Sequence, residues 1–91
     1  MPILDLIWDD WNIEHIKKHD VSRSEVEEVY SSTVIKQETH GKKLLLLGKT
    51  QKGRLITLVI SCRNPSKLYI VSARDMSRKE RNIFYDEKQT L

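Results

Sequence analysis

The sequence has little cysteine and no long apolar run. Cys62 is the only cysteine among its 91 residues, so no internal disulfide can form and the paired cysteines of a zinc site are missing. No apolar stretch approaches the roughly 20 residues of a membrane-spanning helix. The first residues do not show a basic segment followed by an apolar run and a cleavage site. These absences argue against a secreted or membrane-inserted protein and predict a cytoplasmic one.

The composition predicts one compact domain over residues 1–91. Hydrophobic residues make up 38% of the chain and charged residues 32%, a balance that suits a small core with a dense ionic surface. The net charge is +3 and the isoelectric point is about 9.1. Acidic residues gather before residue 39, whereas the segment 74–81 is mainly basic. This asymmetry favours an anionic partner such as nucleic acid without requiring one.

Hydrophobic periodicity and turn residues predict an α+β fold, in which two N-terminal helices and one C-terminal helix pack on a small, mostly antiparallel sheet. Short connections rich in turn-forming residues join the later strands, and such connections are typical of antiparallel neighbours. The first two helices are too short to be stable alone, so they must pack on the sheet. The expected strands are residues 3–8, 33–38, 43–49, 54–62 and 68–74, and the expected helices are residues 11–19, 23–30 and 78–88.

Serine and glutamate three residues apart mark the start of two of these helices. Ser22 is followed by Glu25, and Ser77 by Glu80. In this arrangement, the capping box, each side chain satisfies a backbone N–H of the other residue. Asp9 stands before the first helix, where its carboxylate is expected to act as the cap. The sequence therefore predicts sharp helix starts.

An arginine closes the predicted strand 68–74, directly before the basic helix 78–88. The Arg74 guanidinium is planar, always charged and able to donate two parallel hydrogen bonds, so it suits phosphate oxygens better than lysine does. Arg63 follows the neighbouring predicted strand. We therefore expect both arginines to meet phosphate.

The spacing of these two arginines predicts that one phosphate does not bridge them. If a four-residue hairpin loop joins the two strands, Arg63 pairs with Leu68. Alternation then places Arg63 on the same sheet face as Ile70 and Arg74. At about 3.3 Å per residue the two arginines are roughly 15–20 Å apart. Either they contact different phosphates, or a bulge changes the register.

Three aromatic residues recur every four positions along the first predicted helix. Trp11, His15 and His19 therefore form one row, which we expect to be partly exposed. Two histidines at this spacing are able to bind zinc, but no further ligand is evident, because His40 and Cys62 lie in unrelated contexts. We therefore expect solvated histidines, no metal and no other cofactor.

The end of the same helix offers a candidate for proton transfer. An imidazole titrates near neutrality, so His19 is able to donate or accept a proton, and Lys18 beside it is able to bind phosphate. The alternative is a basic last turn in which Lys17, Lys18 and His19 complement the helix dipole. The spacing alone leaves both interpretations open.

Two tryptophans and the cysteine have structural and functional interpretations. Trp8 and Trp11 are able to stack on bases, but a tryptophan in so small a protein more often packs in the core, which we expect of Trp8. Cys62 lies in an apolar strand with no neighbouring base. A buried small hydrophobic residue is therefore expected there rather than a nucleophile.

Three blocks of sequence stand in an order and spacing that match a known family. The first runs from Trp8 to His19 and contains WDDWN, EHI and KH. The second is VSRSEVEEV, from Val21 to Val29, and the third is VSARDMSRKER, from Val71 to Arg81. Residues 47–50 and 53–54 match the family's central hairpin. Over about residues 6 to 85 the chain thus resembles the BrnT family, the ribonuclease toxins of type II toxin–antitoxin systems.

This resemblance implies a RelE-like fold, metal-independent RNA cleavage that inhibits translation, and neutralisation by a small DNA-binding antitoxin. The implied reaction is attack of a ribose 2′-oxygen on the neighbouring phosphate, which needs a base, an acid and cationic donors. Arg63 and Arg74 match arginines of the family's strands and are expected to stabilise charge. Lys18 and His19 match its Lys/Arg–His pair and are expected to transfer protons. The residues expected to bind RNA beside them are Arg54, Arg78, Lys79 and Arg81.

Two positions depart from the family's pattern. Asp20 stands where glycine usually follows the histidine, so a left-handed helix end is less comfortable there, although aspartate tolerates it better than most residues. Cys62 stands where many members carry an acidic residue. If that carboxylate is the base elsewhere, this chain uses another group or does not cleave RNA. The alternative to an endoribonuclease is therefore a non-catalytic RNA-binding or antitoxin-binding module with the same fold.

Overall fold

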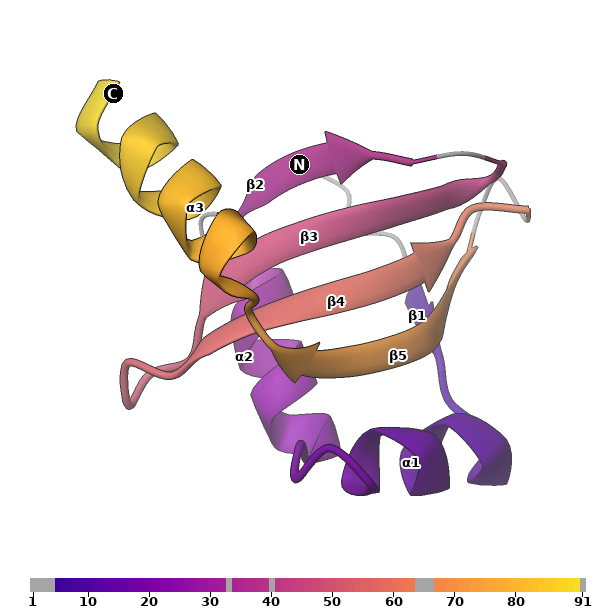
Figure 1. Cartoon of the computed structure of the whole chain (residues 1–91). Coiled ribbons are helices and arrows are strands. Elements are labelled where there is room, and N and C mark those ends of the chain that lie inside the picture. Colours follow the sequence, from indigo (N-terminus) through magenta and orange to yellow (C-terminus); the bar gives the residue numbers. More distant parts are fainter. Residues whose placement is uncertain (1–4, 33, 40, 64–66, 91) are drawn as a thin grey trace.

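The computed structural model describes residues 5–32, 34–39, 41–63 and 67–90. In this part of the chain a sheet of five strands carries three helices (Figure 1), which confirms the predicted α+β fold. The elements in chain order are β1 (Asp5–Ile7), α1 (Asp10–Lys17), α2 (Arg23–Ser31), β2 (Ile35–Glu38), β3 (Lys43–Lys49), β4 (Leu55–Ser61), β5 (Lys67–Asp75) and α3 (Arg78–Thr90).

The sheet has the order β1-β5-β4-β3-β2. The strands from β2 to β5 pair as antiparallel neighbours, whereas β1 lies parallel to β5. The first strand therefore lies at an edge of the sheet. Residues 3–4 and 33, with which two expected strands began, lie outside the described residues.

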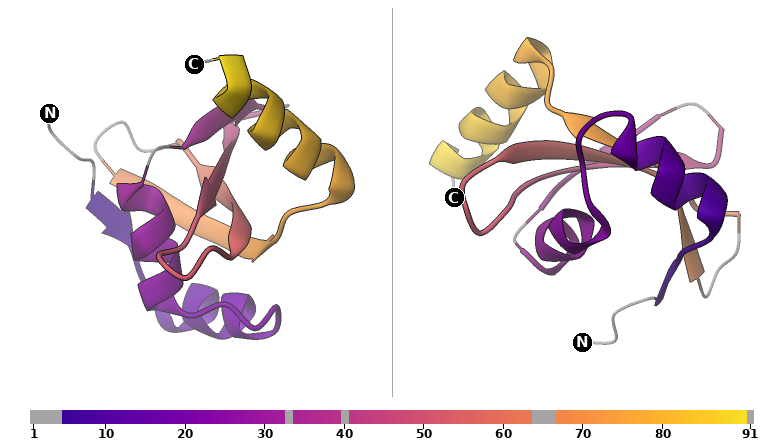
Figure 2. Two further views of the ribbon diagram at one scale, coloured as in Figure 1. Left: turned by 90° about the vertical axis from the view of Figure 1, so that its left-hand side faces the viewer. Right: turned by 90° about the horizontal axis from the view of Figure 1, so that it is seen from below.

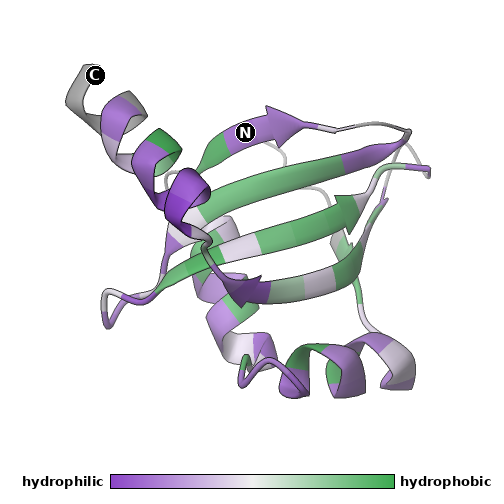
Figure 3. Cartoon of the chain, in the orientation of Figure 1, coloured by the Kyte–Doolittle hydropathy of each residue, from purple (hydrophilic) through white to green (hydrophobic). Residues whose placement is uncertain are grey.

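Helices cover the two faces of the sheet unequally, as Figure 2 shows: α1 and α2 lie on one side and α3 on the other. Alternating side chains supply both faces, so the run of four leucines in β3 is divided between them. Leu44 and Leu46 pack with α1 and α2, whereas Leu47 packs with Phe84 of α3. Colouring by hydropathy shows hydrophobic residues along the central strands and hydrophilic residues at the start of α3 (Figure 3).

The helix α3 covers only one end of its sheet face. Its buried anchor Phe84 packs with Leu47 and Met76, and Leu55 lies against this cluster. Farther along the same face, Leu45 and Val59 are only half-buried. We call this uncovered part the open face of the sheet.

The turn between α1 and α2 is built around Asp20, which has a positive φ of 57°. The amide of Val21 donates to the carbonyl of Ile16, and the amide of Asp20 donates to that of Lys17. These two bonds form a Schellman motif, in which the left-handed residue is usually glycine. Ile16 and Val21 are both buried in the core and complete its hydrophobic contact. Asp20 therefore takes the left-handed conformation that glycine adopts more readily.

The start of each helix follows the expected chemistry. Ser22 with Glu25 and Ser77 with Glu80 make the predicted reciprocal hydrogen bonds. Asp9 caps α1 as expected, and it does so in a third reciprocal box that the sequence analysis missed, because its partner is the buried Asn12. An amide replaces the usual glutamate in that box.

The register between β4 and β5 differs from the prediction because of a bulge. Ile60 pairs with Ile70 and Val59 pairs with Ser72, so Val71 is an extra residue on β5. Beyond an inserted residue the side chains change face. Ile70 therefore points to the α1–α2 core, whereas Arg74 points to the α3 side. The expectation that these two side chains share one face was wrong.

Candidate functional site

The Arg74 side chain lies where the sheet meets the start of α3. Its guanidinium donates two hydrogen bonds to Glu80, of 2.6 Å and 2.9 Å. Thr57, the partner of Arg74 on β4, also donates to Glu80 through its hydroxyl at 2.9 Å. The Arg74 side chain is 36% exposed and that of Glu80 12%. The arginine is therefore fixed in direction while part of it faces solvent.

Charge pairing shifts the titration of both partners. The hydrogen bond from Arg74 lowers the pKa of Glu80 to about 2, and the hydrogen bond to Glu80 raises the pKa of Arg74. Burial of Glu80 opposes its shift, whereas the backbone amide of Ser77 and the hydroxyl of Thr57 support it. Glu80 is thus an ion-paired carboxylate and not a good general base, because a base for proton transfer works best with a pKa nearer the working pH.

Arg54 joins three parts of the chain at the same end of the sheet. Its Nε donates to Asp75 at 2.8 Å, and its Nη1 donates to the Glu25 carboxylate and to the Asp20 carbonyl. Its Nη2 donates to the His19 carbonyl at 3.4 Å. The guanidinium therefore connects the α1–α2 turn to the last residue of β5.

These bonds also shift the pKa values of the groups around Arg54. The hydrogen bond to Asp75 is the main cause that raises the pKa of Arg54, and the same bond lowers the pKa of Asp75. Burial alone raises the pKa of Glu25, but bonds from Ser22 and Arg54 outweigh it, so the net shift is downward. The predicted RNA-binding residue Arg54 is thus already surrounded by two carboxylates.

The side chains of Lys18 and His19 are exposed at the end of α1. Among the described residues neither side chain makes an ion pair or hydrogen bond with Arg74. The connection runs instead through Arg54, which bonds to the His19 carbonyl and to Asp75, the residue after Arg74. The structure therefore brings the α1 end close to the β5 end but leaves the predicted catalytic groups without direct contact.

The three predicted RNA-binding residues of α3 are exposed. Arg78 and Lys79 lie in the first turn, next to Glu80, which holds Arg74. Arg81 follows in the same turn and donates its backbone amide to the Ser77 carbonyl. The start of α3 thus presents these cations to solvent beside the Arg74 guanidinium.

Arg63 lies at the opposite end of the open face. Thr57, the partner of Arg74, precedes Arg63 by six residues, which is roughly 20 Å at 3.3 Å per residue. One phosphate cannot span that distance. The structure therefore does not bring the two candidate arginines together.

The histidine row is present and partly exposed, as expected. The rings of Trp11 and His15 stack with centroids 4.7 Å apart, and His19 meets His15 edge-on at 5.6 Å. Trp11 is 55% exposed, while Trp8 packs against the core, as predicted. Among the described residues no group of three or more histidine, cysteine or acidic side chains is placed to hold a metal ion. His40 lies outside the described residues.

Cys62 packs against the core cluster of α1 and α2, as expected for a small hydrophobic residue. Its backbone amide donates to the Lys42 carbonyl at 2.8 Å. The thiol thus belongs to the face opposite Arg74, and a side chain at this position does not point to the open face.

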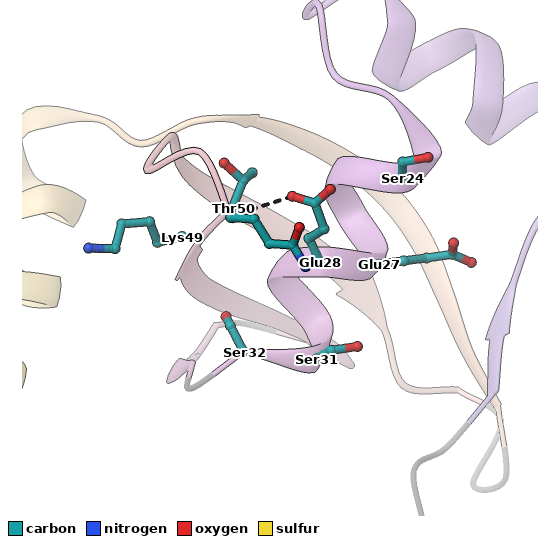
Figure 4. Close-up of a pocket in the computed structure, with 8 residues that line it drawn as sticks. Ser24, Glu27, Glu28, Ser31, Ser32, Lys49 and Thr50 are labelled. Atoms are coloured by element: carbon teal, nitrogen blue, oxygen red, sulfur yellow. Dashed lines mark hydrogen bonds between the residues drawn. The ribbon is translucent and has the colours of Figure 1, made fainter.

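Two hollows of the surface differ in charge. One, of about 590 Å³, lies between α2 and the β3–β4 connection and contains Glu27, Glu28 and Lys49 (Figure 4). There the Gln51 amide donates to Glu28 at 3.0 Å, the dashed bond of Figure 4. The other, of about 480 Å³, contains Lys42, Lys43 and Arg63. Only the second has a charge that suits RNA, because two carboxylates repel phosphate.

No described helix is both long enough and apolar enough to cross a membrane.

Sequence reasoning missed that three carboxylates, Glu25, Asp75 and Glu80, hold Arg54 and Arg74. Asp75 and Glu80 lie within six residues of Arg74, and the sequence pattern identified Glu80 only as a helix cap. The spacing of Arg74 and Glu80 across a strand–helix junction is a signal that could have been used. The sequence contains no comparable signal for the contact between Arg54 and Glu25, because the two residues are 29 positions apart along the chain.

Comparison with known proteins gives one match. The family model described as "Ribonuclease toxin, BrnT, of type II toxin-antitoxin system" matches residues 8–80. No match was found among curated proteins or among solved structures, so the RelE-like assignment stays a prediction. The matched region contains Lys18, His19, Arg63 and Arg74, together with the Glu80 carboxylate that holds Arg74. The chain therefore belongs to the BrnT family, the ribonuclease toxins of type II toxin–antitoxin systems, which implies an RNA substrate and an antitoxin partner.

Proposed function

We propose that this protein is a metal-independent endoribonuclease that acts in the cytoplasm, inhibits translation by cleaving RNA, and is neutralised by a small DNA-binding antitoxin. A ribose 2′-oxygen loses its proton to a base and bonds to the adjacent phosphorus. The bond from phosphorus to the 5′-oxygen breaks, and an acid protonates that oxygen. The products are a 2′,3′-cyclic phosphate and a 5′-hydroxyl, so no oxidant, reductant or metal is needed for the balance.

The single observation that carries the proposal is the fixed Arg74 guanidinium within the matched family region. Glu80 occupies part of its hydrogen-bonding capacity, while 36% of the Arg74 side chain stays exposed. A guanidinium has five N–H donors, so donors remain for a phosphate oxygen. A donor held in place before the reaction stabilises the phosphorane without reorganisation.

Lys18 and His19 are the proposed proton-transfer residues. Both side chains are exposed, and the bonds of Arg54 to the His19 carbonyl and to Asp75 hold the α1 end beside the end of β5. Beyond the short pairing with β1, β5 has no neighbour on that side among the described strands. We therefore propose that RNA passes this edge, with Arg74 on one side and His19 on the other.

The remaining cations are proposed to hold the RNA chain. Arg78, Lys79 and Arg81 are exposed at the start of α3, where the helix dipole also favours a phosphate. Arg63, which lies roughly 20 Å along the sheet from the partner of Arg74, is proposed to contact a different phosphate. Arg54 has less capacity for an RNA contact, because its Nε and Nη1 atoms bond to carboxylates and its Nη2 atom bonds to the His19 carbonyl. One Nη2 N–H remains for a phosphate oxygen.

A second candidate is a non-catalytic RNA-binding or antitoxin-binding module. One observation favours it: among the described residues no hydrogen bond or ion pair joins the side chain of Lys18 or His19, the proposed proton-transfer residues, to Arg74. Phosphate binding needs cations only, whereas cleavage also needs proton transfer. The two candidates therefore differ in what happens to the RNA after binding.

The test is RNA cleavage by the purified protein in the presence of a chelator, beside Arg74→Ala, His19→Ala and the control Lys36→Ala. Lys36 is exposed in β2, which is separated from β5 by two strands of the sheet. We expect cleavage by the wild type and the control, and a loss of about 100-fold or more in the other two variants.

The outcomes separate the hypotheses. Intact RNA with every protein, while RNA binding persists, removes the enzyme and leaves the binding module. Full cleavage by Arg74→Ala removes our assignment of Arg74 but not the activity. Cleavage that stops in chelator and returns with added Mg²⁺ contradicts metal independence.

A further inference from the structure

The open face carries a second cationic feature, far from Arg74. This basic groove has a volume of about 480 Å³ and is lined by Gly41, Lys42, Lys43, Ser61, Arg63, Tyr69 and Val71. Its described lining thus includes three cations and no carboxylate. Pockets that hold small ligands have volumes of about 300–1,000 Å³, so the basic groove has room for part of a nucleotide chain.

The strand register places the groove on the same side of the sheet as Arg74. Lys43 pairs with Ser61, and Ser61 pairs with Tyr69, so these three residues form one row across β3, β4 and β5. Lys43 shares its face of β3 with Leu47, which packs against α3. The row therefore lies on the open face, beyond the end that α3 covers (Figure 1).

The groove cations differ from Arg54 and Arg74 in their surroundings. Lys42, Lys43 and Arg63 are exposed, and none of them makes an ion pair within residues 5–32, 34–39, 41–63 and 67–90. Arg54 and Arg74, in contrast, bind carboxylates of this chain. The three groove cations are therefore bound by no described carboxylate, and an incoming anion displaces no described ion-pair partner there.

Two features give the groove a defined shape. The Cys62 amide donates to the Lys42 carbonyl at 2.8 Å, which fixes the start of β3 against the end of β4. On the other side, the Tyr69 hydroxyl donates to the Asp9 carboxylate at 2.9 Å, and this bond fixes the half-buried Tyr69 ring beside the cations. An aromatic ring next to cations is the usual combination in sites for single-stranded nucleic acid, because bases stack on the ring.

The distance along the sheet decides which phosphate the groove can take. Ser61 follows Thr57, the partner of Arg74, by four residues of β4, or roughly 13 Å at 3.3 Å per residue. Stacked nucleotides rise about 3.4 Å each. The groove therefore lies about four stacked nucleotides from Arg74, and a phosphate in it is not the one held at Arg74.

We propose that the basic groove is an RNA subsite, in which Lys42, Lys43 and Arg63 bind a phosphate several nucleotides along the chain from the cleaved bond and the Tyr69 ring stacks on a base. This inference rests on the proposed function for its substrate class. It moves Arg63 from charge stabilisation at the reacting phosphorus to guidance of the RNA chain, because six residues of β4 and its end separate Arg63 from the partner of Arg74.

The test compares Lys42→Gln/Lys43→Gln with the matched control Lys49→Gln/Lys52→Gln. Both double variants remove two positive charges, and all four lysines are exposed, so both are expected to fold. Binding of a single-stranded eight-nucleotide RNA with 2′-O-methyl groups, which cannot be cleaved at those positions, is measured by fluorescence anisotropy at several salt concentrations. This readout does not depend on catalysis.

We expect the groove variant to bind this RNA about tenfold more weakly than the control. The plot of log affinity against log salt should become shallower by about 0.7 for each phosphate that the removed lysines no longer neutralise. Equal affinity and equal salt slope in the two double variants overturn the proposal. A poly-glutamate peptide of eight residues that competes as well as the RNA also overturns it, because the groove then selects charge and not RNA.

Cleavage gives a second, independent readout. A dinucleotide spans only the reacting bond and does not reach the groove, so both double variants should cleave it as the wild type does. An unmodified eight-nucleotide RNA should show a KM raised about tenfold in the groove variant with kcat unchanged. Equal KM values contradict the subsite. If the wild type cleaves neither RNA, the proposed endoribonuclease fails, while the anisotropy experiment still decides whether the groove binds RNA.

Discussion

Arg74 and Glu80 form a two-pronged ion pair across the junction between β5 and α3. The distances are 2.6 Å from Nη1 to Oε1 and 2.9 Å from Nη2 to Oε2. The same Glu80 carboxylate accepts hydrogen bonds from the Ser77 amide and the Thr57 hydroxyl. One side chain therefore caps α3, joins it to the sheet and orients the arginine of the candidate site.

Glu80→Gln should destabilise the protein by about 2–3 kcal/mol. The amide keeps the size of the side chain and an acceptor for the Ser77 amide, but it removes the charge opposite Arg74. Removal of one partner of a largely buried pair leaves the other uncompensated, and the partial exposure of Arg74 reduces the cost. Urea unfolding measures the change. The control Glu14→Gln, at an exposed position of α1, should stay within about 0.5 kcal/mol of the wild type.

The same pair predicts how stability changes with pH. The pKa of Glu80 is about 2 in the folded protein and 4.5 is its ordinary value, so the pair contributes stability that is fully present above about pH 4.5. This contribution, roughly 3 kcal/mol from the shift, is lost as the pH falls toward 2. Urea unfolding at pH values from 6 to 2.5 should therefore show that the wild type and Glu80→Gln differ less in their free energy of unfolding as the pH falls. A difference that stays constant over this range contradicts the assignment.

The sequence predicted the elements because their signals are local. Capping boxes need residues three positions apart, and the Ser22 and Ser77 boxes are both evident in the sequence. The apolar runs of β3, β4 and β5 also lie within short segments. The antiparallel pairing of successive strands, by contrast, followed only from loop lengths, and the position of β1 beside β5 was not predicted.

The details of the site depend on contacts that no local pattern reveals. The bulge at Val71 reverses the face of every later side chain of β5, Arg74 among them. Arg54 finds its acceptors at Asp20 and Glu25, 34 and 29 residues away. The end of a predicted strand indicated Arg74, and the family resemblance indicated Arg54, but only the folded chain shows what they bind.

Asp20→Gly should stabilise the protein by about 1 kcal/mol. Asp20 has a φ of 57°, and a left-handed conformation costs a residue with a Cβ atom roughly 1–2 kcal/mol. Glycine removes that cost, but its greater conformational freedom also stabilises the unfolded chain and so cancels part of the effect. The contact with Arg54 survives, because Asp20 accepts through its backbone carbonyl. Urea unfolding of the wild type, Asp20→Gly and Asp20→Ala measures the free energy of unfolding. It should be highest with glycine at position 20, lower with aspartate and lowest with alanine, and any other order contradicts the prediction.

Gly48→Ala should destabilise the protein by about 1–3 kcal/mol through a clash. A Cβ atom at Gly48 would lie 2.8 Å from Cγ1 of Val29 and 3.1 Å from Cγ1 of Val34. The absence of a side chain thus lets α2 approach β3 closely. In a Val29→Ala background the nearest methyl is gone, so the added cost of Gly48→Ala should fall by at least half. Equal costs in both backgrounds would show that backbone preference, not space, explains the glycine.

Arg54→Met should loosen the end of α1 and reduce stability by about 2–3 kcal/mol, because it removes the charged donor to Glu25 and the Asp20 carbonyl and methionine supplies none. The matched control is Arg23→Met, since the ion pair of Arg23 with Glu27 is half-exposed on both sides and such pairs contribute about 0–1 kcal/mol.

Hydrogen exchange locates the effect of Arg54→Met. The amides of Asp20 and Val21, which close the Schellman motif, should exchange faster in Arg54→Met and at the wild-type rate in Arg23→Met. Wild-type exchange in both variants would mean that packing of Ile16 and Val21 alone holds the turn. RNA affinity measured on the folded variants then separates two roles of Arg54. A salt slope equal to that of the wild type indicates an arginine that only positions His19, whereas a slope shallower by about 0.7 indicates a direct phosphate contact.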